Sequence, residues 1–142
     1  MSKIENISYA DVLKGNHGNH PCNTILIQIA DPGMEFPIPK HKFYDIKQFN
    51  FLDLNEDAKD TPSGIHLITQ EQAKQIMSIL ETALKSDIDV TVHCTAGLCR
   101  SGAVAEVGEM IGYNYIGLTK QPNSYVKKML LKQIDYYDNM FK

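Results

Sequence analysis

The sequence contains no apolar run close to the roughly 20 residues that a membrane-spanning helix needs. Its first residues, Met1 to Asn6, lack the charged and then apolar profile of a secretory signal peptide. Cysteine is scarce, with three in 142 residues. This odd number argues against a disulfide framework and favours reduced thiols. Together these absences predict a soluble protein of the cytoplasm, without membrane partners.

Strong net charge is also absent, because the formal charge is −3 and the pI is near 5.9. The charge gives no reason to expect nucleic acid as a partner. No Walker loop and no G-x-G-x-x-G motif follows a predicted strand. No cysteine and histidine cluster has the spacing of a zinc site, so we expect no metal and no other cofactor. A length of 142 residues predicts one domain over residues 1–142, and we expect a monomer.

What the sequence does contain is an alternation of strand and helix patterns. The predicted strands cover residues 24–30, 49–54 and 88–92, and the predicted helices cover 70–85, 103–111 and roughly 126–141. Thr69 has the character of an N-cap for the first of these helices. Residues 1–23 are weakly patterned, and 32–48 have the composition of an irregular connection. The pattern predicts a single-domain, three-layer α/β fold, with helices around a mostly parallel sheet of about four or five strands.

One cysteine and one arginine lie six positions apart, in a loop of small residues between the third predicted strand and a helix. A loop that ends at a helix N-terminus turns backbone N–H groups inward and adds the positive end of the helix dipole. Arg100 can offer a planar fork to an oxyanion. These features predict that the pKa of Cys94 falls to about 3.5–7.5, the range of activated cysteines. A thiolate in such a cradle suits attack on phosphorus, which gives a phosphocysteine intermediate.

Residues 93–101, with the sequence HCTAGLCRS, resemble the H-C-x-x-G-x-x-R-S/T signature of cysteine-based protein tyrosine and dual-specificity phosphatases. The resemblance covers roughly residues 20–140 and includes Pro122-Asn123 ahead of the last predicted helix. The layout is most similar to the small dual-specificity-like phosphatases of bacteria and phages. The resemblance implies a phosphotyrosine phosphatase-like fold, hydrolysis of phosphomonoesters on a phosphorylated protein or peptide, and no metal.

The same resemblance implies roles for individual residues. Cys94 is expected to be the nucleophile, and Arg100 to bind the phosphoryl oxygens. Ser101 would donate a hydrogen bond to the departing thiolate. His93 would tune the thiol through the hydrogen bonds of the loop and would not act as a base. The backbone N–H groups that complete the phosphate cradle would be those of Thr95, Ala96, Gly97, Leu98, Cys99 and Arg100.

A poor leaving group needs a proton, usually from an aspartate upstream of the cysteine. The family places this residue on a loop before the helix predicted at 70–85. Asp57 is our first choice, and Glu56 and Asp60 are alternatives. Asp53 is assigned to the second predicted strand instead.

Several alternatives stay open from the sequence. Cys99 stands where the family often has serine or glycine, and it is either a small loop filler or a redox partner for Cys94. A rhodanese-like sulfurtransferase also presents a cysteine in a backbone cradle. A lipid or RNA 5′-phosphate phosphatase and a non-catalytic phosphate-binding module are further alternatives.

Overall fold

The computed structural model describes residues 2–54, 67–117 and 120–140. Within these ranges the strands form one sheet in the order β3-β2-β4-β1-β5, and every pairing is parallel. The strands are β1 (Lys3–Ser8), β2 (Thr24–Ala30), β3 (Asp45–Asn50), β4 (Asp89–Cys94) and β5 (Asn114–Gly117). The helices are α1 (Tyr9–Lys14), α2 (Gln70–Lys85), α3 (Arg100–Ile111) and α4 (Ser124–Met140), with a 3₁₀ turn at Pro21–Asn23. The predicted α/β fold with a central parallel sheet is confirmed.

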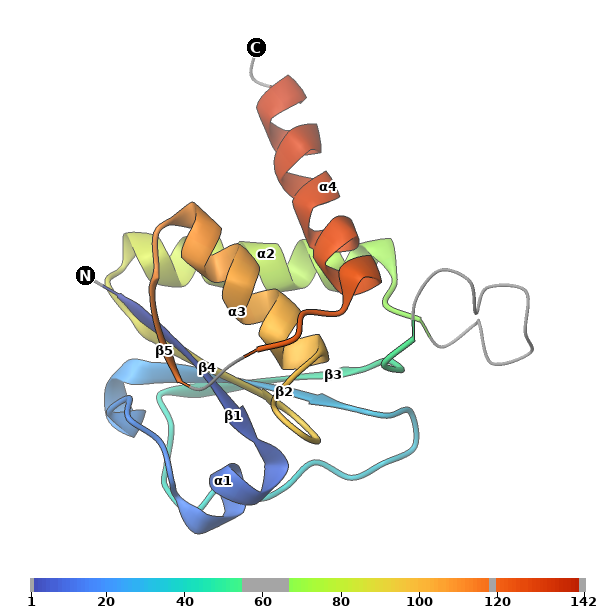
Figure 1. Cartoon of the computed structure of the whole chain (residues 1–142). Helices are drawn as coiled ribbons and strands as arrows, with labels where there is room; N and C mark the ends of the chain where they lie inside the picture. The colour runs from blue at the N-terminus through green and yellow to red at the C-terminus, as the bar shows by residue number, and fades with distance from the viewer. Residues whose placement is uncertain (1, 55–66, 118–119, 141–142) are drawn as a thin grey trace.

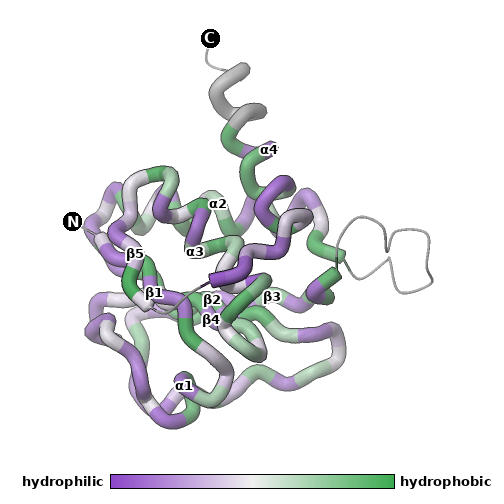
Figure 2. The backbone as a smooth tube through the Cα atoms, viewed as in Figure 1, coloured by the Kyte–Doolittle hydropathy of each residue, from purple (hydrophilic) through white to green (hydrophobic). Residues whose placement is uncertain are grey.

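The helices cover both faces of the sheet. α2, α3 and α4 lie on one face and α1 lies on the other (Figure 1). Successive strand residues point to opposite faces, so neighbours in β2 enter different cores. Ile27 joins the large cluster with the helices α2 to α4, whereas Leu26 joins a smaller cluster with Val12 and Phe43. Figure 2 shows the hydrophobic segments gathered in the central strands. None of the helices in these ranges is long and apolar enough to cross a membrane.

Two predicted elements are confirmed with their bounds. β2 spans residues 24–30, as its continuous aliphatic run predicted for a strand covered on both faces. α2 begins after Thr69, whose hydroxyl accepts from the backbone N–H of Gln72 at 3.0 Å. The Gln72 side chain in turn accepts from the backbone N–H of Thr69 at 3.0 Å. This reciprocal pair is a capping box, which fixes where the helix starts.

Other predictions were incomplete or wrong. β1 and β5 were not predicted, and β1 has no clear apolar pattern because two of its residues, Glu5 and Asn6, are polar and buried. Glu5 is buried and accepts hydrogen bonds from the backbone N–H groups of Gly18 and Asn19. The second predicted strand lies earlier than expected, since β3 ends at Asn50. Asp53 is therefore not a strand residue but lies in the connection that follows β3.

The parallel sheet brings the carboxyl ends of three neighbouring strands to one edge. Ala30 at the end of β2 pairs with Asn50 at the end of β3, and Gln28 of β2 pairs with His93 of β4. The residues that follow these strands therefore meet at this edge, where ligands bind in open parallel α/β sheets. Cys94 closes β4 at the same edge.

Candidate active site

The loop between β4 and α3, residues 95–99, is called the cysteine loop below. Gly97 within it has φ +73°, in the left-handed region that favours glycine. A Cβ at this position would lie 2.6 Å from the carbonyl oxygen of Ile7, in β1. The Asn6 side chain donates to the Gly97 carbonyl at 2.7 Å, and the Tyr9 N–H donates to the Thr95 carbonyl at 3.1 Å. β1 and the start of α1 thus hold the loop tightly.

Cys94 is buried, with 3% of its surface exposed, and its Sγ lies 3.1 Å from the Ser101 hydroxyl. Burial by itself raises the pKa of the thiol. The Ser101 hydroxyl and the backbone N–H groups of Ser101, Gly97 and Leu98 outweigh that effect, so the pKa of Cys94 lies below its ordinary value. The inward backbone donors and the lowered pKa expected from the sequence are both present. A lowered pKa favours the thiolate, which is the nucleophilic form of cysteine.

His93 is completely buried, and its Nδ1 lies 3.3 Å from the Cys94 carbonyl oxygen. Burial lowers the pKa of His93 to about 4, with a smaller lowering from Arg100, although the contact with the Cys94 carbonyl raises it. The imidazole is therefore neutral near pH 7 and adds no positive charge beside the thiolate. Its contact is with the backbone carbonyl of Cys94, at the end of β4. The tuning role expected for His93 stays a prediction.

Arg100 is 4% exposed, and both terminal nitrogens of its guanidinium donate hydrogen bonds. Nη1 donates to Asp31 Oδ1 at 2.6 Å and to the Phe51 carbonyl at 2.8 Å. Nη2 donates to the Thr95 hydroxyl at 3.3 Å. The Nε–H is buried and has no partner among the described residues. A buried donor without a partner is costly, and an oxyanion bound beside the loop would satisfy it.

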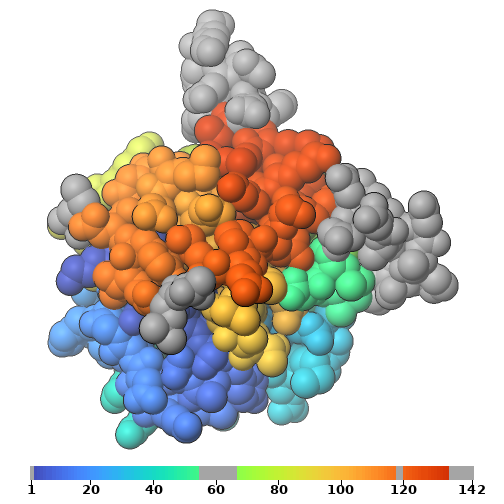
Figure 3. All heavy atoms as spheres, in the orientation of Figure 1, coloured from blue at the N-terminus to red at the C-terminus, as the bar shows by residue number. Residues whose placement is uncertain are grey.

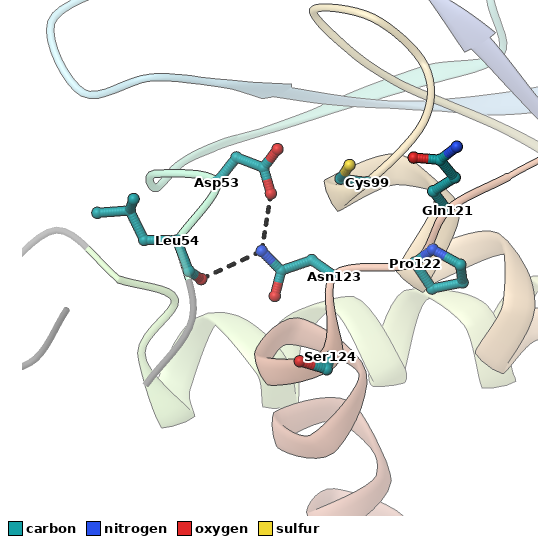
Figure 4. A pocket seen from close by; sticks show the side chains of 7 residues that line it. All are labelled: Asp53, Leu54, Cys99, Gln121, Pro122, Asn123 and Ser124. Carbon is teal, nitrogen blue, oxygen red and sulfur yellow. Dashed lines mark hydrogen bonds between the residues drawn. The ribbon is translucent and has the colours of Figure 1, made fainter. Parts of the chain in front are cut away.

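A cavity of about 410 Å³ adjoins the cysteine loop on the side of Cys99. Figure 4 shows the residues that line it, which are Asp53, Leu54, Cys99, Gln121, Pro122, Asn123 and Ser124. The Asn123 side chain donates to Asp53 Oδ1 at 2.7 Å and to the Leu54 carbonyl at 3.1 Å. The segment after β3 and the segment before α4 are thus joined at the cavity.

Cys99 faces this cavity. Burial raises the pKa of its thiol, and the neighbouring Asp53 carboxylate and Cys94 raise it further, against a smaller lowering by Arg100. The Cys99 thiol is therefore protonated near pH 7, and its pKa is shifted in the opposite direction to that of Cys94. The redox role of Cys99 stays a prediction, which peroxide treatment and mass analysis for a Cys94–Cys99 linkage would test.

In the space-filling view, the gold atoms of the cysteine loop reach the surface between three other segments (Figure 3). These are the segment after β2, in light blue, the segment after β3, in green, and the start of α4, in red-orange. The four segments are far apart in the sequence. The folded sheet brings them to the same face of the molecule.

Among the predicted site residues, Cys94 contacts Ser101 and Arg100 contacts Thr95. Asp57, Glu56 and Asp60 lie outside the described residues. In the part of the chain that is described, no group of three or more histidine, cysteine, aspartate and glutamate residues could hold a metal ion.

Sequence reasoning did not assign three further residues at this edge, namely Asp31, Asp53 and Asn123. A signal was present for Asp31, because it follows the strand predicted at 24–30. Asp53 was missed because it was placed inside the strand predicted at 49–54. Asn123 belonged to the resemblance ahead of the last predicted helix, but its contacts with Asp53 and Leu54 depend on the path of the chain before α4.

No protein-family model matches this chain, and no curated protein matches it by sequence. Solved structures do resemble it. Human DUSP28 superposes with a TM-score of 0.57 at 14% identity, over 96% of this chain and 94% of that one. A human tyrosine phosphatase-like serine/threonine/tyrosine-interacting protein superposes with a TM-score of 0.59 at 17% identity, over 92% and 89%.

These neighbours are human proteins, so the finer resemblance to bacterial and phage phosphatases stays a prediction. At such low identity the similarity concerns the fold alone. The chain has the fold of the dual-specificity phosphatases.

Proposed function

We propose that this protein is a cysteine-dependent phosphomonoesterase that acts without metal on phosphorylated proteins or peptides. The observation that supports the proposal best is the pairing of Cys94 with Arg100. The pKa of the thiol is lowered by inward N–H groups, and the buried guanidinium keeps one donor without a partner. A phosphoryl group satisfies both features at once, because it offers an electrophile to sulfur and oxygen acceptors to the donors.

In the first step, the Cys94 thiolate attacks phosphorus. The S–P bond forms as the P–O ester bond breaks, and the leaving oxygen takes a proton from an acid. The backbone N–H groups and Arg100 stabilise charge on the nonbridging oxygens. Asp31 and the Phe51 carbonyl hold the guanidinium in place, so little rearrangement is needed when the phosphoryl group binds.

In the second step, water attacks phosphorus and gives a proton to the carboxylate that the acid has become, while the S–P bond breaks. Phosphate leaves, and the thiolate is regenerated. The Ser101 hydroxyl lies 3.1 Å from Cys94 Sγ, which suits donation of a hydrogen bond to the departing thiolate.

Asp53 is the proton donor that the described geometry supports. Its carboxyl group lines the cavity beside the cysteine loop and interacts with Cys99, the residue before Arg100. Asp57 remains the choice made from the sequence. The two assignments differ in a measurable way, because only the true donor produces the basic limb of the pH–rate profile.

The central experiment is hydrolysis of p-nitrophenyl phosphate with a chelator present, comparing the wild type with Cys94→Ser. We expect metal-independent turnover in the wild type and none in the variant. Retained turnover in Cys94→Ser, or a requirement for added metal, would exclude the mechanism.

The same assays separate the alternatives. Turnover of thiosulfate instead of phosphate esters would favour a sulfurtransferase. Binding of inorganic phosphate without turnover would favour a phosphate-binding module. Preference for a lipid phosphate or an RNA 5′-phosphate over phosphopeptides would change the substrate class but not the mechanism.

The proton donor is tested with Asp53→Asn and Asp57→Asn, each assayed across pH. Loss of a general acid costs typically about 10²–10⁴-fold in rate. We expect Asp53→Asn to lose at least 100-fold and to lack the basic limb, whereas Asp57→Asn keeps both rate and limb. The reverse result would return the assignment to Asp57.

A further inference from the structure

Asn123 is the point where three parts of the proposed active site meet. Its backbone N–H donates to the Cys99 carbonyl at 3.0 Å, which ties it to the cysteine loop. Its side-chain N–H₂ group donates to Asp53 Oδ1 and to the Leu54 carbonyl (Figure 4). Its side-chain oxygen accepts from the backbone N–H groups of Tyr125 and Val126, at 2.9 and 3.0 Å.

These contacts leave the Asn123 side chain little freedom. The oxygen is committed as the N-cap of α4, because it accepts from the second and third residues of that helix. The orientation of the amide is thereby fixed, and the nitrogen can point only toward the segment after β3. A longer or shorter side chain would not reach both partners.

We propose that Asn123 is a positioning residue for the proton donor Asp53, and this inference rests on the proposed function. The Asn123 amide holds Asp53 Oδ1 as an acceptor, which fixes the orientation of the carboxyl group that would carry the proton for the leaving group. The second bond, to the Leu54 carbonyl, fixes the backbone that carries Asp53. The Asn123 side chain therefore fixes the position of Asp53 relative to the cysteine loop.

The inference predicts a specific defect. A displaced proton donor slows only those substrates whose leaving group needs a proton. Phenyl phosphate needs it, whereas difluoromethylumbelliferyl phosphate releases a stable anion and needs it far less. Loss of a hydrogen bond to a charged group corresponds to about a tenfold change or more.

The experiment uses Asn123→Ser, which keeps an N-cap oxygen but is too short to reach Asp53. Asn123→Asp is a second variant, which keeps the cap and the length but presents no N–H. We expect each to lose about tenfold on phenyl phosphate and less than threefold on difluoromethylumbelliferyl phosphate. Thr69→Ala is the matched control, because it removes the N-cap of α2 and should leave the ratio of the two rates unchanged.

A double-mutant cycle completes the test. Because Asn123 acts through Asp53, Asn123→Ser should cause no further selective loss in the Asp53→Asn background. Equal losses on both substrates, or a selective loss that persists without Asp53, would overturn the inference while the proposed function stands. A wild-type protein that hydrolyses neither substrate would refute the proposed function and, with it, the role of Asn123.

Discussion

At the scale of single residues, His93 connects the site to the stability of the protein. It is completely buried, and burial lowers its pKa from 6.5 to about 4. In the unfolded chain the imidazole takes up a proton below about pH 6.5, whereas in the folded protein it does so only near pH 4. Since the unfolded state binds more protons in that window, stability falls as the pH falls.

We therefore expect His93→Gln to remove part of the acid sensitivity of the protein. A shift of this size corresponds to about 3 kcal/mol, lost progressively between pH 6.5 and 4. Urea unfolding at several pH values gives the free energy of unfolding of wild type and variant at each pH. The slopes of the two pH dependences are then compared. An identical pH dependence in the two proteins would contradict the buried neutral imidazole.

At the scale of elements, the cysteine loop depends on β1, a strand that sequence patterns did not reveal. Gly97→Ala would place a Cβ 2.6 Å from the carbonyl oxygen and 2.7 Å from the carbonyl carbon of Ile7. The alanine would also have to adopt the φ of +73° that Gly97 has. Backbone atoms of a central strand cannot move aside. We expect Gly97→Ala to lose at least about 3 kcal/mol of stability, from left-handed strain and overpacking, and most of its phosphatase activity.

Gly33→Ala is the matched control for that variant. Gly33 has φ +82°, yet a Cβ there would meet nothing within 4 Å. It should lose only about 1–2 kcal/mol, the cost of the left-handed conformation, and keep its activity. Denaturant unfolding and p-nitrophenyl phosphate turnover measure both effects. Equal losses in the two variants would show that contact with β1 is unimportant.

Sequence analysis predicted those elements whose signals are local. β2 is a continuous aliphatic run, α2 starts at a capping box, and Cys94 to Ser101 form a dense motif. β1 was not predicted because it carries buried polar residues whose partners are distant in the sequence: Glu5, for example, accepts from the Thr91 hydroxyl at 3.2 Å. β3 was misplaced because it lies at the edge of the sheet and is mostly exposed, so no alternating pattern marks it.

At the scale of the whole molecule, the fold class was predictable from the sequence. The contacts that join distant segments at the site were not. Strands separated by helices indicate a parallel sheet. The contacts of Arg100 with Asp31 and of Asn123 with Asp53 span 69 and 70 positions. Such pairs follow from how elements pack and not from any local pattern, so only the structure reveals them.

The proposed cradle should couple anion binding to the stability of the entire domain. A ligand that binds only the folded state stabilises it by about 2.7 kcal/mol at 100 times its Kd. We expect inorganic phosphate and vanadate each to raise the Tm of the wild type. Phosphate should also raise the Tm of Cys94→Ser. Arg100→Ala should respond much less, because it lacks the guanidinium; an undiminished response would place the anion elsewhere.

The strand order has a consequence for folding. β1 lies between β4 and β5, so Ile4 pairs with Val90 and with Tyr115, and the sheet is complete only when β1 has paired with two strands far along the chain. Such distant pairings make folding slow compared with the formation of single helices. Because the cysteine loop rests on β1, we expect it to be completed late in folding. During refolding, return of Cys94 reactivity would report the finished sheet, not the earlier appearance of helical structure.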